Sequence, residues 1–446
     1  MLDLVIRGAT VVSAEANLNA DVGIEGGTIV ELAPQGATLK ARETVDADGL
    51  WLMPGLVDAH VHLREPGLEH KEGFASGTRA AAAGGVTTVM VMPTDNPVTI
   101  TPAHFIEKRA LAERSAQVDF ALQAGLGADG SHIPELVDLG AVSFEIFLAD
   151  MPDALLIDNA EILLQLLTRI AACASIAGIT PGDHGVVSSR TRTIRAISTG
   201  AAADFPGTRP PVSEALGVAR ACIAAGDTGA RVHLRQLSCR AGASALAALR
   251  GGGAITAEVT PHNLYLDASA LQRLGPFAKV GPPLRPIDDV RAMQTALQAR
   301  QIDIVATDHA PHLPEEKRAG ETDIWKAPSG LPGLQTFLPV MLKLVESGVI
   351  GINDLVRVCA SEPARIFGLQ CKGRIATGMD ADLILLNPRA TFQVRNEDQL
   401  SKSRITPFAG LETRGRLDRV FLRGCEILRD GKLISANKGK FISPRR

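Results

Sequence analysis

Short apolar runs alternate with longer amphipathic segments through the middle of the chain. The apolar runs have the length and composition of buried β-strands, whereas the amphipathic segments repeat apolar residues with the period of an α-helix. Strand–helix alternation of this kind, sustained over about 300 residues, is typical of a parallel α/β fold. The strand-like runs include residues 85–93 (GVTTVMVMP), 119–127 (DFALQAGLG), 141–149 (AVSFEIFLA), 230–238 (ARVHLRQLS), 255–264 (ITAEVTPHNL) and 303–309 (DIVATDH).

Both ends of the chain show a different pattern, in which β-rich runs are separated by turn signals. This spacing predicts antiparallel strands. Neither end is long enough for a core of its own, so we expect residues 1–54 and 366–446 to form one small composite β-sandwich domain. Residues 55–365 would then form the α/β domain. The terminal runs are residues 2–12, 20–33, 43–55, 381–394 and 419–435.

The length of the α/β region fits a closed (β/α)8 barrel of the TIM type. The active site of such a barrel lies at the C-terminal ends of its strands. A doubly wound open sheet is the structural alternative, but no Gly-x-Gly-x-x-Gly motif follows the first strand. The pattern therefore favours the barrel.

Composition narrows the possible classes of protein. The 446 residues carry a net charge of −3, which gives no basic footprint for nucleic acid. No apolar run reaches 18 residues, and the first residues resemble a strand rather than a signal peptide, so we expect no membrane association. The six cysteines include no Cys-x-x-Cys pair, which indicates reduced thiols and a cytoplasmic protein.

Two histidines lie one residue apart in GLVDAHVHLREPG, residues 55–67. On a β-strand, the side chains of His60 and His62 project from the same face. A metal-chelating pair is one interpretation of this spacing. Two partly buried histidines with hydrogen-bond partners are the other.

Other polar residues interrupt or end apolar strands, where their burial is costly unless they bind something. Several strand ends that converge on one barrel mouth could therefore hold a metal, since imidazole and carboxylate groups suit zinc and similar divalent ions. These residues are Glu145 within AVSFEIFLA, His184 after GITPGD, His233 and Gln236 in VHLRQLS, and Asp308 in DIVATDH.

Six blocks of the sequence follow one another in a characteristic order. The blocks are DAHVHLREPG (58–67), RPPVSEALGVAR (209–220), VHLRQLS (232–238), EVTPHNL (258–264), KVGPPLR (279–285) and ATDHAPHLPEEK (306–317). Together they resemble the dihydroorotase branch of the amidohydrolase superfamily, and the β-rich ends are similar to the composite β domain of that family. The resemblance implies a deformed (β/α)8 barrel with one or two divalent metal ions, most often zinc, and a role in pyrimidine biosynthesis.

Carried over position by position, the resemblance implies that His60, His62 and Asp308 hold the more buried metal. Asp308 would also be the catalytic base that takes a proton from water. The alternative for Asp308 is a structural carboxylate that caps the following loop. Glu145 matches the position of a carboxylated lysine that bridges two metals in most members, and a glutamate there could bridge or hold only one ion.

The second metal site departs from the family pattern. His184 matches one of its ligands, whereas Gln236 stands where the other ligand is normally a histidine. Glutamine offers only a neutral amide oxygen, which is a poorer zinc ligand than imidazole, and Gln236 could equally be a polar filler. We therefore expect one firmly bound zinc ion and a second ion that is weak or absent.

Only some of the residues that the resemblance implies as substrate contacts have the same type in this sequence as in the family. Arg64 matches a carboxylate-binding arginine and His312 a substrate-contacting histidine, and Gly330 is included with them. Thr94 and Gly281 replace asparagines that bind the substrate ring. A small cyclic amide with an acid group is still the expected ligand, but its identity is open.

The leading hypothesis is a dihydroorotase-like hydrolase that reversibly opens dihydroorotate, or a related ring, to N-carbamoyl-aspartate. A hydantoinase, allantoinase or cyclic imidase is the enzymatic alternative. A non-catalytic paralogue that serves as a scaffold is the third hypothesis, because Glu145 and Gln236 both weaken the second metal site. Proteins of this resemblance are commonly homodimers or homotetramers, although no interface signature is visible in the sequence.

Overall fold

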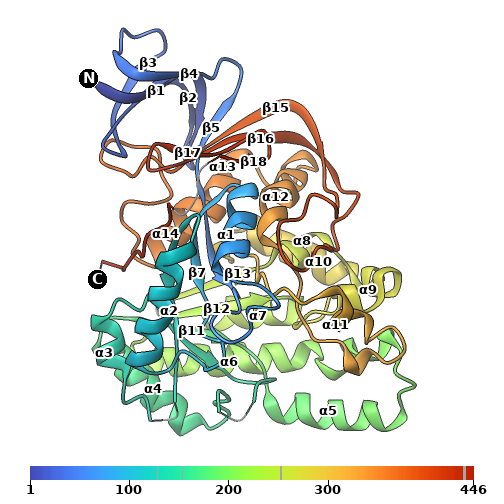
Figure 1. Ribbon diagram of the computed structural model, residues 1–446. Helices are drawn as coiled ribbons and strands as arrows, with labels where there is room; N and C mark the ends of the chain where they lie inside the picture. The colour runs from blue at the N-terminus through green and yellow to red at the C-terminus, as the bar shows by residue number, and fades with distance from the viewer. Residues whose placement is uncertain (128, 153, 252–253, 435–437, 446) are drawn as a thin grey trace.

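The computed structural model describes residues 1–445 apart from residues 128, 153, 252–253 and 435–437. Strands from both ends of the chain join in one sheet, which lies above the α/β region in Figure 1. Within the described residues this sheet has nine strands in the order β18-β17-β16-β15-β5-β1-β2-β3, with β4 paired to β1. Their bounds are Leu2–Val12 (β1), Asn17–Glu25 (β2), Thr28–Pro34 (β3), Ala41–Asp46 (β4), Trp51–Pro54 (β5), Leu383–Gln393 (β15), Glu412–Leu422 (β16), Cys425–Arg429 (β17) and Lys432–Leu433 (β18).

Strand β5 connects the two halves of this sheet. It pairs in parallel with β1 and in antiparallel with β15 from the other end of the chain. The prediction of a composite β domain built from both termini is confirmed. Residues after the last strand return to the barrel, where the Phe120 amide donates to the Lys440 carbonyl (3.0 Å) and the Ile442 amide donates to the Phe120 carbonyl (2.8 Å).

The α/β region has parallel strands in two arcs, β6-β7-β8 and β9-β10-β11-β12-β13-β14. Strands β8 and β9 are separated only by Gln123, so the two arcs meet along one run of chain. An isolated parallel bridge between Val61 and His309 joins the outer edges. The order is that of a distorted (β/α)8 ring. The bounds are Leu56–Val61 (β6), Val86–Val91 (β7), Asp119–Leu122 (β8), Ala124–Gly125 (β9), Phe144–Phe147 (β10), Ile176–Thr180 (β11), Arg231–Leu237 (β12), Ile255–Val259 (β13) and Ile304–Val305 (β14).

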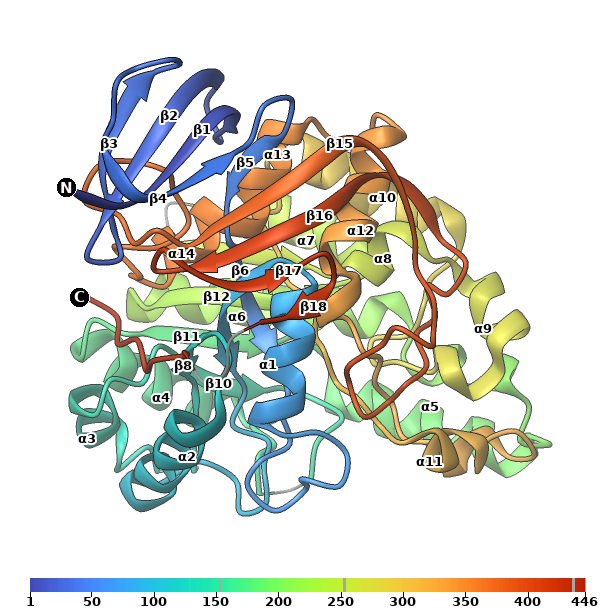
Figure 2. The ribbon, with the colours of Figure 1, turned by 45° about the horizontal axis from the view of Figure 1, so that its top comes forward.

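Helices lie around these strands, as Figure 2 shows, and helical segments follow most of the strands along the chain. Strands β6, β7 and β10 are buried along their whole length, as expected for parallel strands covered on both faces. The helices are Phe74–Ala83 (α1), Pro102–Ser115 (α2), Ile133–Asp138 (α3), Ala160–Ala172 (α4), His184–Ile197 (α5), Pro211–Thr228 (α6), Arg240–Leu249 (α7), Pro261–Tyr265 (α8), Ala268–Leu274 (α9), Ile287–Gln298 (α10), Pro314–Arg318 (α11), Phe337–Glu346 (α12), Ile352–Val356 (α13) and Glu362–Ile366 (α14).

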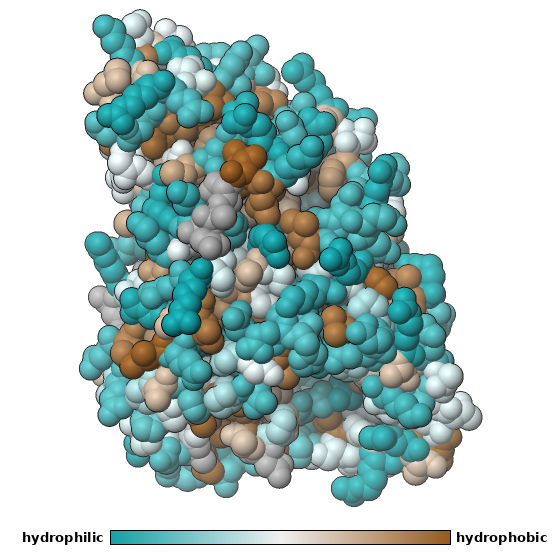
Figure 3. All heavy atoms as spheres, viewed as in Figure 1, coloured by the Kyte–Doolittle hydropathy of each residue, from teal (hydrophilic) through white to brown (hydrophobic). Residues whose placement is uncertain are grey.

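The surface shown in Figure 3 is covered mainly by hydrophilic residues, with the hydrophobic ones in small separate groups. Among the described residues, no helix combines the length and the apolar character that crossing a bilayer requires.

Candidate active site

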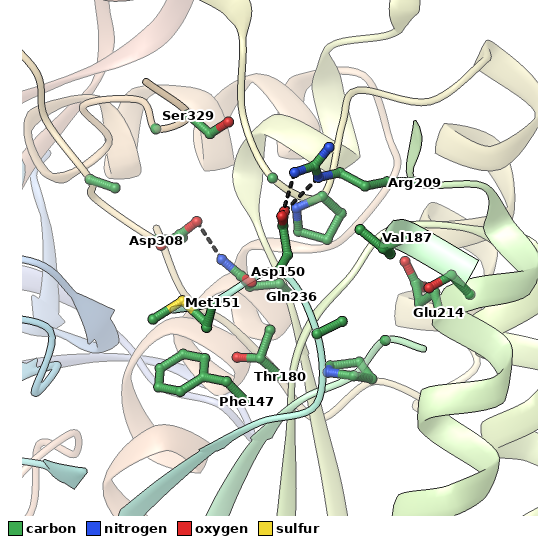
Figure 4. A pocket seen from close by; sticks show the side chains of 18 of the residues that line it. Phe147, Asp150, Met151, Thr180, Val187, Arg209, Glu214, Gln236, Asp308 and Ser329 are labelled. Carbon is green, nitrogen blue, oxygen red and sulfur yellow. Dashed lines mark hydrogen bonds and ion pairs between the residues drawn. The ribbon is translucent and has the colours of Figure 1, made fainter. Parts of the chain in front are cut away.

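A cavity of about 290 Å³ lies where the C-terminal ends of the barrel strands converge (Figure 4). This is the end of the barrel at which parallel α/β folds place their active sites. The residues that line it from the strand ends are His60, His62, Thr94, Phe147, Ala149, Thr180, Gln236 and Asp308. Those from the surrounding loops and helices include Arg64, Asp150, Met151, Val187, Arg209, Glu214, Gly281, Arg285, Ser329 and Gly330.

His60, His62 and Asp308 form a compact group at the bottom of this cavity. Oδ1 of Asp308 lies 3.3 Å from Nε2 of His60 and 3.1 Å from Nε2 of His62. One ligand atom of each residue lies within 4.8 Å of the others. Nε2 of Gln236 donates a hydrogen bond to the second carboxylate oxygen of Asp308, as Figure 4 shows.

The other ring nitrogens of both histidines are held by neighbouring side chains. Nδ1 of His60 lies 2.5 Å from Oε1 of Glu258, and Nδ1 of His62 lies 2.7 Å from Oγ1 of Thr94. When Nδ1 of His60 donates to the Glu258 carboxylate, its Nε2 keeps the lone pair that a metal requires.

Electrostatics favour a neutral imidazole at His62 and an ionised carboxylate at Asp308. Burial lowers the pKa of His62 to about 4. Burial alone would raise the pKa of Asp308, but His60 and His62 outweigh it and hold the pKa below its usual value. Near pH 7, His62 and Asp308 are therefore in the forms that ligate a divalent cation. Burial alone would lower the pKa of His60, but Glu258 and Asp308 raise it, so that a cation would displace a proton from this ring.

The donor set fits one divalent cation. Two imidazole nitrogens and a carboxylate oxygen converge from the strand ends, which is the three-ligand arrangement of a catalytic site that leaves a position for water or substrate. Glu258 and Thr94 hold the rings from behind, as supporting groups do in metal sites.

Comparison with known proteins shows the family to which this chain belongs. Residues 49–242 match the model of the dihydro-orotase-like family, and residues 256–434 match that of the amidohydrolase family. The chain is 36% identical over 442 residues to a dihydroorotase of Methanothermobacter thermautotrophicus, covering 99% of this chain and 97% of that protein. This chain belongs to the amidohydrolase family.

Other relatives of this amidohydrolase have different names, although their sequence identity to it is similar. It is 35% identical to an allantoinase of Rubrobacter xylanophilus, over 100% of this chain and 98% of the relative. The L-hydantoinase (dihydropyrimidinase) from Arthrobacter aurescens superposes with a TM-score of 0.96 at 28% identity, over 99% of this chain and 100% of that one. The chain is therefore a hydrolase of cyclic amides, and these relatives are named for different rings.

The substrate-contacting residues expected from the sequence gather at this cavity in the amidohydrolase. Arg64, Thr94, Gly281 and Gly330 line it. His312 does not line it, but its Nε2 lies 3.3 Å from Nη2 of Arg64 and 3.1 Å from the Ser329 carbonyl. His312 thus contacts the arginine rather than the cavity itself.

Glu145 does not reach the cavity, which corrects its expected role as a bridging ligand. Its carboxylate is buried inside the barrel and accepts hydrogen bonds from Nε (3.1 Å) and Nη2 (2.7 Å) of Arg235. The adjacent strand leaves room for it with Gly178, since a Cβ there would lie only 2.3 Å from Oε1 of Glu145. The Glu145 carboxylate therefore forms a buried ion pair with Arg235.

His184 is also corrected as a metal ligand. Strand β11 ends at Thr180, and Asp183 caps the N-terminus of α5, so that His184 is the first residue of this helix. Its Nε2 lies 3.0 Å from Oγ of Ser188 one turn further on, and it is not among the residues that line the cavity. Thr180, four residues earlier, is the residue that β11 presents to the cavity.

Sequence reasoning missed two charged groups beneath the site. Arg235 stands inside the apolar strand VHLRQL and Glu258 inside TAEV, and both are fully buried. A charged residue in a buried strand needs a partner of opposite charge. The signal that could have revealed this group is the presence of one basic and two acidic residues, Arg235, Glu145 and Glu258, within apolar strands.

Proposed function

We propose that this amidohydrolase reversibly hydrolyses a small cyclic amide that bears a carboxylate, with dihydroorotate and its open form N-carbamoyl-aspartate as the first candidates. The reaction would belong to pyrimidine biosynthesis. The observation that carries the proposal is Arg64, which lies in the same cavity as His60, His62 and Asp308 and forms no ion pair among the described residues.

One divalent cation, for which zinc is the first choice, would be held by His60, His62 and Asp308. When bound, such an ion supplies a Lewis acid for the amide carbonyl and lowers the pKa of a water molecule. The buried, neutral His62 and the ionised Asp308 are in the protonation states that this binding needs.

Asp308 would move the proton. Its carboxylate would take a proton as the water oxygen attacks the carbonyl carbon, and would return the proton to the ring nitrogen as the C–N bond breaks. The positive φ of 48° at Asp308 and the hydrogen bond from Gln236 hold the carboxylate in place for both steps. Ring closure would use the same groups in reverse order.

Arg64 would bind the substrate carboxylate. It lines the cavity, and its buried Nε has no hydrogen-bond partner within the described part of the protein. None of the ion pairs among the described residues involves Arg64. A planar guanidinium left in this state is suited to bidentate capture of a carboxylate.

A neutral or alkylated ring, as in hydantoin hydrolysis, is the second candidate. Phe147, Met151 and Val187 form an apolar part of the cavity wall, where an uncharged substituent would fit. Thr94 is already hydrogen-bonded to His62, so it is less free to read a polar ring. The high structural similarity to an L-hydantoinase supports this alternative.

The test is a substrate panel with protein loaded with zinc or manganese. Ring opening of dihydroorotate is followed in the ultraviolet, beside 5-substituted hydantoins and allantoin. Turnover of dihydroorotate that disappears in Asp308→Asn supports the proposal. Turnover of hydantoins alone selects the second candidate, and the absence of both turnover and bound metal argues against both.

A further inference from the structure

The guanidinium of Arg235 lies in the interior of the barrel, on strand β12 next to the metal-site residue Gln236. Its side chain is fully buried. An arginine has five N–H donors, and here the structure provides five hydrogen bonds. They run from Nε to Glu145, from Nη1 to the Ala59 carbonyl (3.1 Å) and Glu258 (3.0 Å), and from Nη2 to Gln123 and Glu145.

Both carboxylate oxygens of Glu145 accept hydrogen bonds, and Arg235 donates to each of them. Its Oε2 accepts from Arg235, and its Oε1 accepts from Arg235 and from the Ser143 hydroxyl (2.8 Å). An ion in the place of the guanidinium would use the oxygens that now hold it, which belong to Glu145, Glu258, Gln123 and the Ala59 backbone. His184 and Gln236 would not take part, because His184 bonds to Ser188 and the Gln236 amide donates to Asp308.

Glu258 connects the guanidinium to the metal site. Its Oε2 accepts from Nη1 of Arg235 and lies 3.1 Å from Nε2 of His233, while its Oε1 faces Nδ1 of His60. Burial alone would raise the pKa of Glu258, but Arg235 and His60 hold it well below its usual value. Arg235 thus contacts Glu258, which holds the ring of His60, and Glu145, the carboxylate that was expected to bridge two ions.

The guanidinium charge also opposes a second cation in this region. Arg235 pairs with the carboxylates of Glu145 and Glu258, and all three side chains are buried. A divalent ion beside the guanidinium would bring like charges together away from water, which is strongly unfavourable.

We infer that Arg235 takes the place of a second metal ion, so that this chain holds one divalent cation per subunit and Arg235 prevents the binding of another. The inference rests on the ion site of the proposed function and adds to it the residue that limits the number of ions. Arg235 acts here through Glu145 and Glu258 and does not touch substrate.

The experiment counts metal ions per chain. Wild-type protein, Arg235→Met and the double variant Arg235→Met/Glu145→Met are stripped with chelator and titrated with Co²⁺, with bound cobalt counted by mass spectrometry and its visible absorption recorded. Methionine removes the charge while it keeps a long side chain. We expect one equivalent in the wild type, two in Arg235→Met, where Glu145 is freed, and one in the double variant.

Two further variants are controls. Arg250→Met tests the loss of an arginine ion pair elsewhere in the protein, and Arg235→Lys tests the loss of the guanidinium group while the positive charge is kept. Arg250→Met removes a guanidinium that pairs with Asp303 (2.8 Å) away from the cavity, and one equivalent is expected. Arg235→Lys keeps the positive charge, and one equivalent is again expected. Circular dichroism and thermal melting establish that each variant is folded before its cobalt is counted.

The outcomes separate this inference from the proposed function. Two equivalents in the wild type overturn the inference even if Arg235→Met fails to fold, and leave a metal-dependent hydrolase standing. A folded Arg235→Met that still binds one ion overturns it as well. No ion in the wild type contradicts the proposed function itself.

Discussion

Nδ1 of His60 lies 2.5 Å from Oε1 of Glu258, although 198 residues separate them in the chain. His60 comes from the end of β6 and Glu258 from β13, and both are buried. The contact fixes which ring nitrogen of His60 faces Asp308 and the cavity. Groups that hold a metal-binding histidine from behind orient the ring and raise its basicity, and so strengthen metal binding.

Replacement of Glu258 by Gln should therefore weaken metal binding without removing a ligand. The amide cannot stabilise the donating Nδ1–H of His60 as a carboxylate does, and we expect metal affinity to fall by about 10- to 100-fold. Competition with a chromophoric chelator measures the affinity. Glu214→Gln, at another buried carboxylate that lines the cavity but contacts neither histidine, should leave the affinity close to that of the wild type. Equal affinities in wild type and Glu258→Gln would refute the role of Glu258.

Asp308→Asn tests the proposed proton transfer. The amide cannot accept the proton from water, so kcat should fall by at least about 10²- to 10⁴-fold, the range of a lost general base. Because Asp308 is also a proposed ligand, metal content is measured in the same preparation, and the comparison is made at saturating metal. Full activity of a metal-loaded Asp308→Asn would show that another group takes the proton.

Arg64→Met tests whether the cavity selects acids. Loss of charged hydrogen bonds to a carboxylate amounts to about 1.5–3 kcal/mol, or about 10- to 100-fold in kcat/KM. We expect this loss with dihydroorotate and little change with dihydrouracil, the same ring without the carboxylate. If dihydroorotate is not a substrate, hydantoin-5-acetate and hydantoin form the equivalent pair. A similar loss with both members of a pair would assign Arg64 to folding rather than to specificity.

Much of the fold could be predicted because it depends on local pattern. Continuous apolar runs such as residues 86–91 form buried parallel strands, and the β-rich ends form the composite sheet. The pairing of β5 with β15 could not be read from the chain, since it joins residues more than 300 positions apart. The same holds for the bridge from Val61 to His309 that closes the strand order.

The positions of the site residues could be predicted from the sequence only in part. That His60 and His62 face one cavity follows from their alternation on a strand. His184 does not lie at a strand end as expected, because the strand ends at Thr180, and the Pro-Gly-Asp that follows is a turn and a helix cap. Glu145 was placed on the right strand, but its partner Arg235 lies 90 residues further along, so no local pattern indicated which way the charge would be neutralised.

Lys317 offers a test of the loop that completes the cavity. It lies on α11, and its buried Nζ donates to the carbonyls of Lys279 (2.9 Å) and Pro328 (3.0 Å), next to the cavity residues Ser329 and Gly330. Burial, with smaller contributions from the charges of Lys279 and Arg64, lowers the pKa of Lys317 to about 7. In the unfolded chain the pKa of a lysine is about 10.5.

Between pH 7 and 10.5 the unfolded state therefore binds a proton that the folded state does not. The free energy of unfolding contributed by Lys317 should rise with pH across this window and be lowest below pH 7, where both states are charged. Relative to Lys317→Met, wild-type protein should gain stability from pH 7 to pH 9, as measured by denaturant midpoints at fixed ionic strength. Lys40→Met, at an exposed lysine, should show no such trend. A difference between wild type and Lys317→Met that stays constant with pH would mean that Lys317 is charged in the folded protein, and that its carbonyl contacts alone stabilise the loop.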